Sequence, residues 1–144
     1  MPAEANKALV RRYYEELWNR RDPAVADELF APGFRLFPDA LPGPEGVKRF
    51  YTRLLTAFPD LWVRVDDLIA AGGNTVVARF ALGGTHRGEF LGIPATGKPM
   101  AIEEITVWRI ADRTIAERWT AVDALDVVQQ LGGRAALPAE ATDG

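Results

Sequence analysis

Three side chains in this sequence are suited to moving a proton to or from a bound molecule. Asp123 falls between an expected last strand and an expected last helix, where burial would favour its protonated form and let it exchange a proton with substrate; the position also suits a plain helix N-cap. His86 is the single histidine, and it either faces the site or holds its glycine-rich loop together. Glu104, in an expected strand, either lines a pocket or is an exposed carboxylate. These residues are the predicted catalytic candidates.

The expected strands place further polar groups near Glu104. Successive residues of a strand point to opposite faces of a sheet, so Glu104, Thr106 and Trp108 share one face. On the last strand, Thr120 shares a face with Arg118. Alternation leaves open which face is the inner one, and a β-bulge would exchange the two faces. If Glu104 faces inward, we expect Thr106 and Thr120 to contact substrate.

Aromatic residues are numerous enough to form flat walls for a fused-ring ligand. They make up 10% of the chain and include four Trp and seven Phe. Aromatic residues at helical spacing usually belong to the core, so we expect most of them there and a few against the ligand. The aromatic side chains predicted to bind substrate are Tyr14, Trp18, Phe37, Phe50, Phe58 and Trp119.

Composition excludes several classes of site. The 144 residues contain no cysteine, which excludes disulfides, thiolate metal sites and cysteine nucleophiles, and one histidine excludes sites that need two imidazoles. The net charge of −3 argues against binding to duplex nucleic acid. No apolar run approaches the ~18 residues of a membrane span, and the first residues do not resemble a signal peptide. We therefore expect a cytoplasmic protein without metal, membrane or nucleic-acid partners.

Helical spacing dominates the first part of the sequence, and alternation of β-branched residues dominates the second. Asp22 and Asp123 are expected N-caps, each just before a short helix. Residues 83–99, with five glycines and two prolines, predict an irregular excursion between two hairpins. The predicted helices cover 9–18, 23–30, 47–58 and 124–131, and the predicted strands cover 34–37, 61–70, 75–82, 99–110 and 114–122.

Helices followed by an antiparallel sheet predict an α+β fold in a single domain over residues 1–133. Residues 134–144 are expected to form a flexible tail. About three N-terminal helices over the concave face of a curved sheet would form a cone that encloses a pocket.

Several stretches resemble one family. GTHRGEFLGIPATGKP (84–99), AFPDLWVRVDDLIA (57–70) and ERWTAVDALDVVQQLG (117–132) are similar to the SnoaL-like polyketide cyclases, and RRYYEELWNRRD (11–22) and PGPEGVKRFY (42–51) fit the same pattern. The resemblance implies the cone-shaped α+β barrel of nuclear transport factor 2-like proteins. It further implies a small-molecule pocket, no cofactor and a homodimer or homotetramer.

The resemblance also implies a choice of reactions. Cyclases of this family close a ring of an anthracycline precursor by intramolecular aldol condensation, using an acidic residue as general acid and base; relatives take part in hydroxylation or open epoxides. The cyclases' catalytic aspartate falls on Thr120 and their histidine on Thr106, whereas Asp123 matches an acid common in the wider family. These two threonines lower the weight of the aldol interpretation and raise that of hydroxylation.

Three hypotheses follow. The leading one is cofactor-independent, acid–base cyclisation of an aromatic polyketide in an apolar pocket. The second is a hydroxylation component, paired with a reductase, or an epoxide hydrolase. The third is a non-catalytic module for ligand binding or dimerisation.

Overall fold

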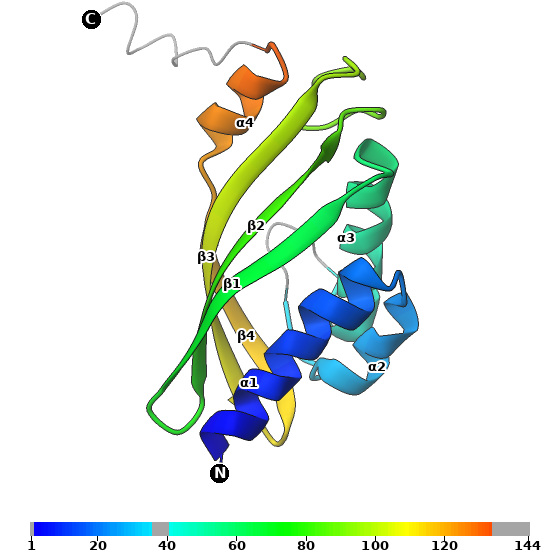
Figure 1. Ribbon diagram of the computed structural model, residues 1–144. Coiled ribbons are helices and arrows are strands. Elements are labelled where there is room, and N and C mark those ends of the chain that lie inside the picture. The colour runs from blue at the N-terminus through cyan, green and yellow to red at the C-terminus, as the bar shows by residue number, and fades with distance from the viewer. Residues whose placement is uncertain (1, 36–40, 134–144) are drawn as a thin grey trace, which may run out of the picture.

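A four-stranded antiparallel sheet is the centre of the computed structural model, which describes residues 2–35 and 41–133. Its strands are β1 (Trp62–Ala71), β2 (Thr75–Thr85), β3 (Pro99–Ala111) and β4 (Thr114–Ala121). The strand order in the sheet is β1-β2-β3-β4, so every strand pairs with its neighbours along the chain. The sheet is strongly twisted and curved (Figure 1).

Helices cover one face of this sheet. They are α1 (Pro2–Arg12), its π-helical continuation η1 (Tyr13–Asn19), the 3-10 turn η2 (Pro23–Val25), α2 (Ala26–Leu29), α3 (Gly43–Ala57) and α4 (Ala124–Gln130). In Figure 1, α1, α2 and α3 lie on the same side of the sheet, whereas α4 lies at one end of the long strands. The predicted α+β fold is confirmed. Among the described helices, none is long and apolar enough to cross a membrane.

The burial of β3 settles which face of the sheet is the inner one. Glu104, Thr106 and Trp108 are buried, whereas Glu103 and Ile105 are exposed. The inner face thus carries the polar residues that alternation had placed together. A two-against-one bulge follows on β4, where the register shifts between the partners of Arg109 and Ile110.

The π-helical segment η1 turns two adjacent tyrosines toward the core. Its wider winding is marked by the bond from the N–H of Arg20 to the carbonyl of Glu15, 2.9 Å long and five residues back. Successive side chains are closer in direction in this winding than in an α-helix, and Tyr13 and Tyr14 are both at least 95% buried.

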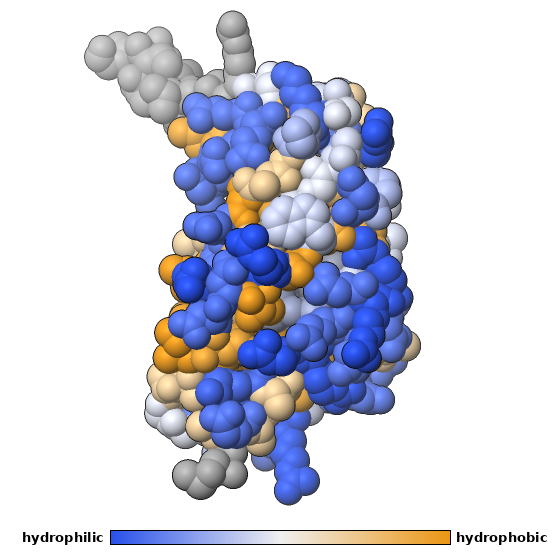
Figure 2. All heavy atoms as spheres, viewed as in Figure 1, coloured by the Kyte–Doolittle hydropathy of each residue, from blue (hydrophilic) through white to orange (hydrophobic). Residues whose placement is uncertain are grey.

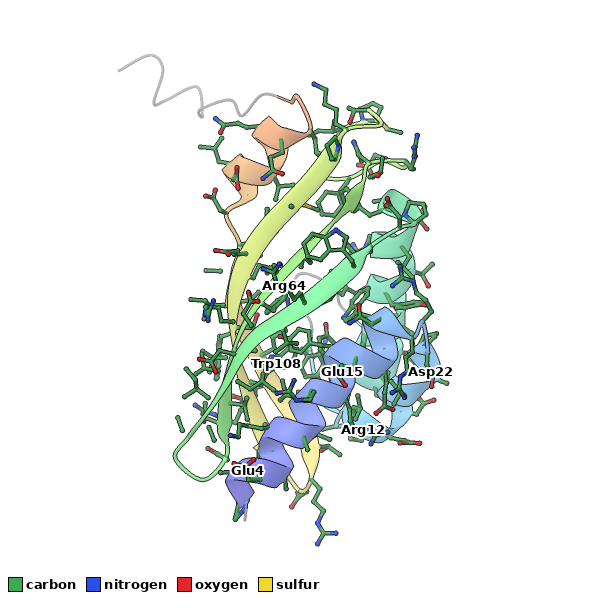
Figure 3. The ribbon with its side chains drawn as sticks, viewed as in Figure 1. Glu4, Arg12, Glu15, Asp22, Arg64 and Trp108 are labelled. Atoms are coloured by element: carbon green, nitrogen blue, oxygen red, sulfur yellow. The ribbon has the colours of Figure 1, made fainter. Side chains whose placement is uncertain are left out.

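Polar residues cover the opposite side of this helix. Arg12 forms ion pairs of 2.7 Å with Glu16 and with Glu28, which ties α1 to η1 and α2. In Figure 3, Glu4, Arg12 and Glu15 point away from the sheet, while Trp108 lies behind the helix. Figure 2 shows the same division, with hydrophilic residues over the helical side.

The connection from β2 to β3, residues 86–98, is anchored on the end of α3. The N–H groups of Arg87 and Gly88 both donate to the carbonyl of Ala57, at 2.8 and 3.2 Å. A Cβ atom on Gly88 would lie 2.4 Å from the carbonyl oxygen of Thr56, so only glycine fits this close approach.

The same connection contains a two-residue turn. Phe90 and Ile93 exchange two backbone hydrogen bonds of 3.0 and 2.9 Å, and Leu91 and Gly92 between them have φ angles of 52° and 79°. Positive φ at both central positions is the type I′ pattern, which asparagine or glycine adopts more readily than leucine.

Element ends agree with the predictions within a few residues, with differences in the first part of the chain. The first helix begins at Pro2 and changes to π-helix at Tyr13. Asp22 makes no side-chain capping bond. The strand predicted over 34–37 is reduced to an isolated bridge between Arg35 and Pro42, and Phe37 lies outside the described residues.

Candidate active site

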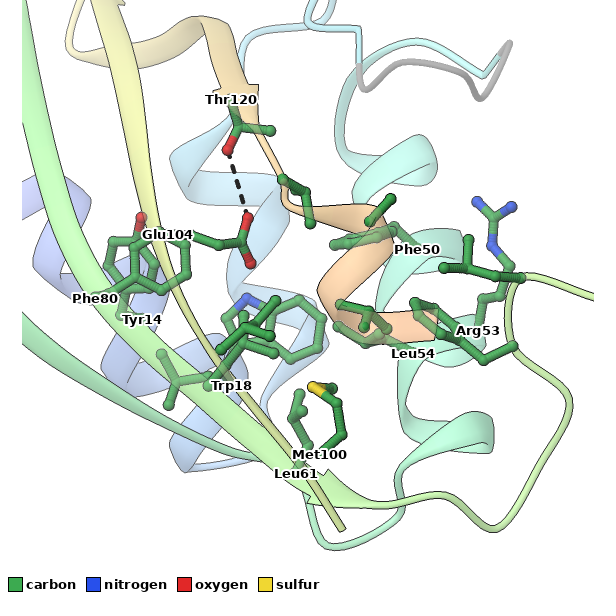
Figure 4. Close-up of a pocket in the computed structure, with 18 of the residues that line it drawn as sticks. Tyr14, Trp18, Phe50, Arg53, Leu54, Leu61, Phe80, Met100, Glu104 and Thr120 are labelled. Carbon is green, nitrogen blue, oxygen red and sulfur yellow. Dashed lines mark hydrogen bonds between the residues drawn. The ribbon is translucent and has the colours of Figure 1, made fainter. Parts of the chain in front are cut away.

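A cavity of about 520 Å³ lies between the inner face of the sheet, the helices and the connection 86–98. Its walls are mainly aromatic and aliphatic, with Tyr14, Trp18 and Phe50 on the helical side and Phe80 on β2 (Figure 4). This volume lies within the usual range for sites that enclose a small organic molecule. The cavity predicted from the order of the elements is therefore present, with Tyr14, Trp18 and Phe50 in its wall.

Glu104 is the buried carboxyl group of this cavity. Only 8% of the residue is exposed, and this burial raises its pKa. The positive charge of Arg118 and a hydrogen bond from Thr120 oppose the rise without cancelling it. A carboxyl group with a raised pKa holds its proton at higher pH than an ordinary one, which suits a group that must both accept and return a proton.

Two threonine hydroxyls connect Glu104 to the core. The hydroxyl of Thr106 donates to that of Thr120 at 2.9 Å. Oγ1 of Thr120 lies 3.4 Å from Oε1 of Glu104 and 3.3 Å from the carbonyl oxygen of Ile105, so its single hydrogen can be donated to either acceptor. Figure 4 shows the Thr120–Glu104 contact at the cavity wall. Thr106 is fully buried behind it and positions Thr120 without lining the cavity.

Arg118 also lines the cavity. From the sequence it was predicted only to share a strand face with Thr120, and no role was predicted for it. Its guanidinium carbon lies 5.7 Å from the centre of the Trp108 ring and 5.8 Å from that of Phe50. Its register with Trp108 and its shared face with Thr120 were the signals that could have identified it.

Tyr14 joins the helical wall to the sheet. Its hydroxyl accepts a hydrogen bond of 3.0 Å from Nε1 of Trp108. Burial raises the pKa values of Tyr13 and Tyr14, so both phenols are neutral at physiological pH. Tyr14 therefore presents a neutral, amphipathic wall to a bound ligand.

Asp123 and His86 lie outside the cavity lining. The exposed carboxylate of Asp123 accepts the N–H of Asp126 at 3.0 Å, which is the N-cap of α4 that the sequence also allowed. His86 is fully buried, with Nδ1 2.9 Å from the hydroxyl of Thr96 and its ring 5.6 Å from that of Phe58. In the structure, Asp123 starts a helix and His86 holds the connection 86–98 in place.

Two of the aromatic residues predicted to bind substrate point elsewhere. Trp119 is 52% exposed on the outer face of the sheet, because its neighbours Arg118 and Thr120 take the inner face. The guanidinium carbon of Arg109 lies 5.0 Å from the centre of its ring. Phe58 is fully buried between His86 and Phe90, behind the cavity wall. Within residues 2–35 and 41–133, no cluster of His, Asp or Glu is arranged to hold a metal ion.

A curved antiparallel sheet and helices around a partly open, mainly apolar cavity define the class of α+β folds to which the chain belongs. Residues 8–131 match the family model described as SnoaL-like polyketide cyclase, and the chain belongs to this family. It is 33% identical over 128 residues to the aklanonic acid methyl ester cyclase DnrD of Streptomyces peucetius, covering 86% of this chain and 88% of that protein.

Solved structures agree with this assignment. TsrD from Streptomyces laurentii superposes with a TM-score of 0.83 at 30% identity, covering 91% of this chain and 97% of TsrD. AclR from Streptomyces galilaeus, described as a hydroxylase, superposes with a TM-score of 0.76 at 24% identity. The superposition covers 98% of this chain and 89% of AclR, which shows that the two proteins share the fold.

Proposed function

We propose that this protein closes a ring of an aromatic polyketide by an intramolecular aldol reaction, with Glu104 as the general acid and base. The observation that carries the proposal is a buried carboxyl group of raised pKa in the wall of an apolar cavity, hydrogen-bonded by Thr120. Family membership and 33% identity to an aklanonic acid methyl ester cyclase support a polyketide substrate. The role falls to Glu104 because Asp123 and His86 do not line the cavity.

The reaction needs a proton to leave a carbon atom and a proton to reach an oxygen atom. The Glu104 carboxylate takes a proton from the carbon between two carbonyl groups, and the resulting enolate carbon attacks a ketone carbonyl of the same molecule. A carbon–carbon bond forms and the ketone oxygen becomes an alkoxide. Glu104 then returns its proton to that alkoxide, so the product is an isomer of the substrate. General acid–base catalysis of this kind contributes about 10²–10⁴ in rate.

The walls of the cavity supply orientation. Tyr14, Trp18 and Phe50 present flat surfaces on the helical side, and a fused-ring substrate that lies against them keeps its reactive carbon facing the sheet. Such positioning converts a rare conformation of a flexible polyketide into the bound one. Thr120 offers the carboxyl group of Glu104 a hydrogen bond through its hydroxyl.

Hydroxylation of a polyketide is the second candidate. Thr106 and Thr120 form a bonded pair of hydroxyls at the positions where the family resemblance places the cyclases' histidine and aspartate. A threonine hydroxyl does not act as a base near neutral pH. This candidate requires molecular oxygen and a reductant such as NADPH with a partner reductase.

Turnover of aklanonic acid methyl ester tests the proposal. Wild type, Glu104→Gln and Glu103→Gln are each incubated with the ester, and products are followed by chromatography and mass analysis. We expect a product of unchanged mass and altered retention, formed at least about 10²-fold more slowly by Glu104→Gln. Glu103→Gln is the matched control, because it removes an exposed carboxylate from the opposite face of the same strand.

Two results would contradict the proposal. Unchanged substrate in the presence of wild type would refute cyclisation, and a Glu104→Gln variant as fast as wild type would refute the role of Glu104. A gain of one oxygen by a cyclised anthracyclinone, seen only with NADPH, oxygen and a reductase, would establish the hydroxylation alternative.

A further inference from the structure

Arg118 is a cation in the cavity wall, and among the described residues no carboxylate forms an ion pair with it. In the described part of the chain, no hydrogen bond or ion pair joins it to another residue, and its Nε atom is buried without a partner. A buried charge is costly unless an opposite charge or hydrogen-bond acceptors compensate it. An anionic group of a ligand would compensate this charge.

Two arginines outside the cavity have close carboxylate partners. Arg12 has two carboxylates at 2.7 Å, and Arg64 has the carboxylate of Asp66 at 2.8 Å. Each of these arginines is on the surface, where the need for a partner is smallest. Arg118 differs from them in lying in the cavity wall, where a guanidinium whose Nε has no bonded partner is more costly.

Aromatic rings hold Arg118 in this place. The guanidinium carbon lies 5.7 Å from the ring of Trp108 on β3 and 5.8 Å from the ring of Phe50 on α3. Cation–π contacts of this kind contribute about 0.5–1 kcal/mol at exposed sites and more when water is excluded. They fix the guanidinium without using its N–H donors, which stay available to a ligand.

Glu104 interacts with Arg118 only at longer range, where the positive charge of Arg118 opposes the rise in the pKa of Glu104. No ion pair within 4 Å joins it to Arg118 among the described residues, and burial raises its pKa, which favours its neutral form. Two further charged residues of opposite sign, Arg53 and Glu89, line the cavity, with Arg53 on the opposite side from Glu104 (Figure 4). The attraction for a negatively charged group is therefore local to Arg118.

We propose that Arg118 is the counter-ion for a negatively charged oxygen of the ligand, so that the cavity selects planar aromatic compounds that carry an enolate or a carboxylate. The planar fork of the guanidinium suits two oxygens side by side, as in a carboxylate or a β-dicarbonyl enolate. The enolate case rests on the proposed function, since the enolate is its intermediate. The carboxylate case stands on the cavity alone.

Binding of a matched pair of probes tests this inference without turnover. Fluorescence titrations compare 2-anthracenecarboxylate with its methyl ester, which has similar shape and no charge. We expect wild type to bind the carboxylate about tenfold or more tightly than the ester, and Arg118→Gln to lose this preference. Arg79→Gln, which removes an exposed arginine from β2, should keep it. Equal affinity of wild type for both probes, or an unchanged preference in Arg118→Gln, would refute the inference.

Further variants separate binding from folding. Removal of an uncompensated charge is expected to leave the Tm of Arg118→Gln at or above that of wild type; a fall in Tm together with weaker binding of both probes would identify a structural residue and overturn the inference. Arg118→Lys keeps the charge without the fork and should retain part of the preference.

A second pair of probes distinguishes the source of the negative oxygen. 2-Acetyl-1-tetralone forms a β-dicarbonyl enolate with its own absorption band, and 1-tetralone does not. Enolate absorption at a lower pH with wild type than with Arg118→Gln supports the enolate, and preference for the anthracene carboxylate alone supports the carboxylate. A protein that shows either preference but does not cyclise the polyketide ester would refute the proposed function and support the role of Arg118.

Discussion

The hydroxyl of Tyr14 and the indole of Trp108 form a hydrogen bond of 3.0 Å in the interior, across 94 positions of sequence. Tyr14 comes from η1 and Trp108 from the middle of β3, so the bond links the helical wall of the cavity to the sheet. Both residues are at least 99% buried and both line the cavity. The positions of the two walls are therefore coupled by a buried polar contact, in addition to the two hydrogen bonds between Asn19 of η1 and Val63 of β1.

Removing this contact should destabilise the fold. Tyr14→Phe leaves the Nε1–H of Trp108 buried without an acceptor, which costs about 1–3 kcal/mol in the free energy of unfolding, measured by urea denaturation. Tyr51→Phe is the control, because it removes a hydroxyl from a partly exposed ring on α3. Equal losses in the two variants would show that the hydrogen bond contributes nothing specific.

Glu104 should make stability depend on pH. Burial raises its pKa above the ordinary 4.5. At a pH between 4.5 and the raised pKa, the folded state therefore holds a proton that the unfolded state has released. The free energy of unfolding therefore falls as pH rises through this window, and Glu104→Gln, which does not titrate, lacks that contribution. Urea denaturation of both proteins at several pH values from 4 to 8, a range set by the ordinary carboxylate pKa, measures the difference.

The variant should thus gain stability relative to wild type as pH rises. Glu103→Gln, measured in parallel, corrects for the loss of a carboxylate as such. If the difference between wild type and Glu104→Gln is flat or has the opposite sign, Glu104 is not a buried acid in solution.

Asp123 should matter for α4 more than for chemistry. Asparagine also caps helices, so Asp123→Asn should keep the stability of wild type, whereas Asp123→Ala should lose about 0.5–2 kcal/mol. Because Asp123 does not line the cavity, the rate of Asp123→Asn with the polyketide ester should stay within a few-fold of wild type. A 10²-fold loss of rate in a stable Asp123→Asn would restore the catalytic role predicted from the sequence.

Leu91 holds a strained backbone conformation at the cavity wall. Leucine at a φ of 52° costs about 1–2 kcal/mol, a cost that asparagine largely avoids. Leu91→Asn should therefore be more stable than wild type by about 0.5–1 kcal/mol and should bind 2-anthracenecarboxylate more weakly, because an apolar wall is lost. Leu91→Ala separates the effects, since it removes the wall and keeps the strain. A Leu91→Asn variant no more stable than Leu91→Ala would contradict the strain argument.

The contact of Gly88 with α3 should tolerate no side chain. A Cβ atom would lie 2.4 Å from the backbone oxygen of Thr56, so Gly88→Ala must displace the connection and should cost about 1–3 kcal/mol in thermal or urea unfolding. Gly73→Ala is the control, because a Cβ atom there meets nothing within 4 Å. Loss of stability in Gly88→Ala without weaker ligand binding would separate this contact from the cavity.

Local patterns were sufficient to predict most of the fold. Alternation in β3 grouped Glu104, Thr106 and Trp108 on one face, and helical spacing located α3. The decision between the two faces needed the whole molecule, because the bulge near Arg109 changes the alternation on β4 and only packing against the helices shows which side is buried.

The site was predicted in part for the same reason. Glu104 and Thr120 were found by their strand positions, whereas Arg118 was overlooked because an arginine in a strand usually points to solvent. His86 was assigned to the site from its residue type, but the connection 86–98 packs it against Phe58, which no local pattern could predict. Asp123 satisfied both a catalytic and a capping pattern, and the structure shows the cap.

The π-helical winding of η1 gives this part of the chain one residue more than an α-helix of the same length would hold. Deletion of the exposed Glu15 would allow the segment to rewind as α-helix between unchanged ends, with one of the two tyrosines turned out of the core. A single-residue gap at this place in an alignment of the family would therefore mark a change in the cavity wall and leave the framework intact.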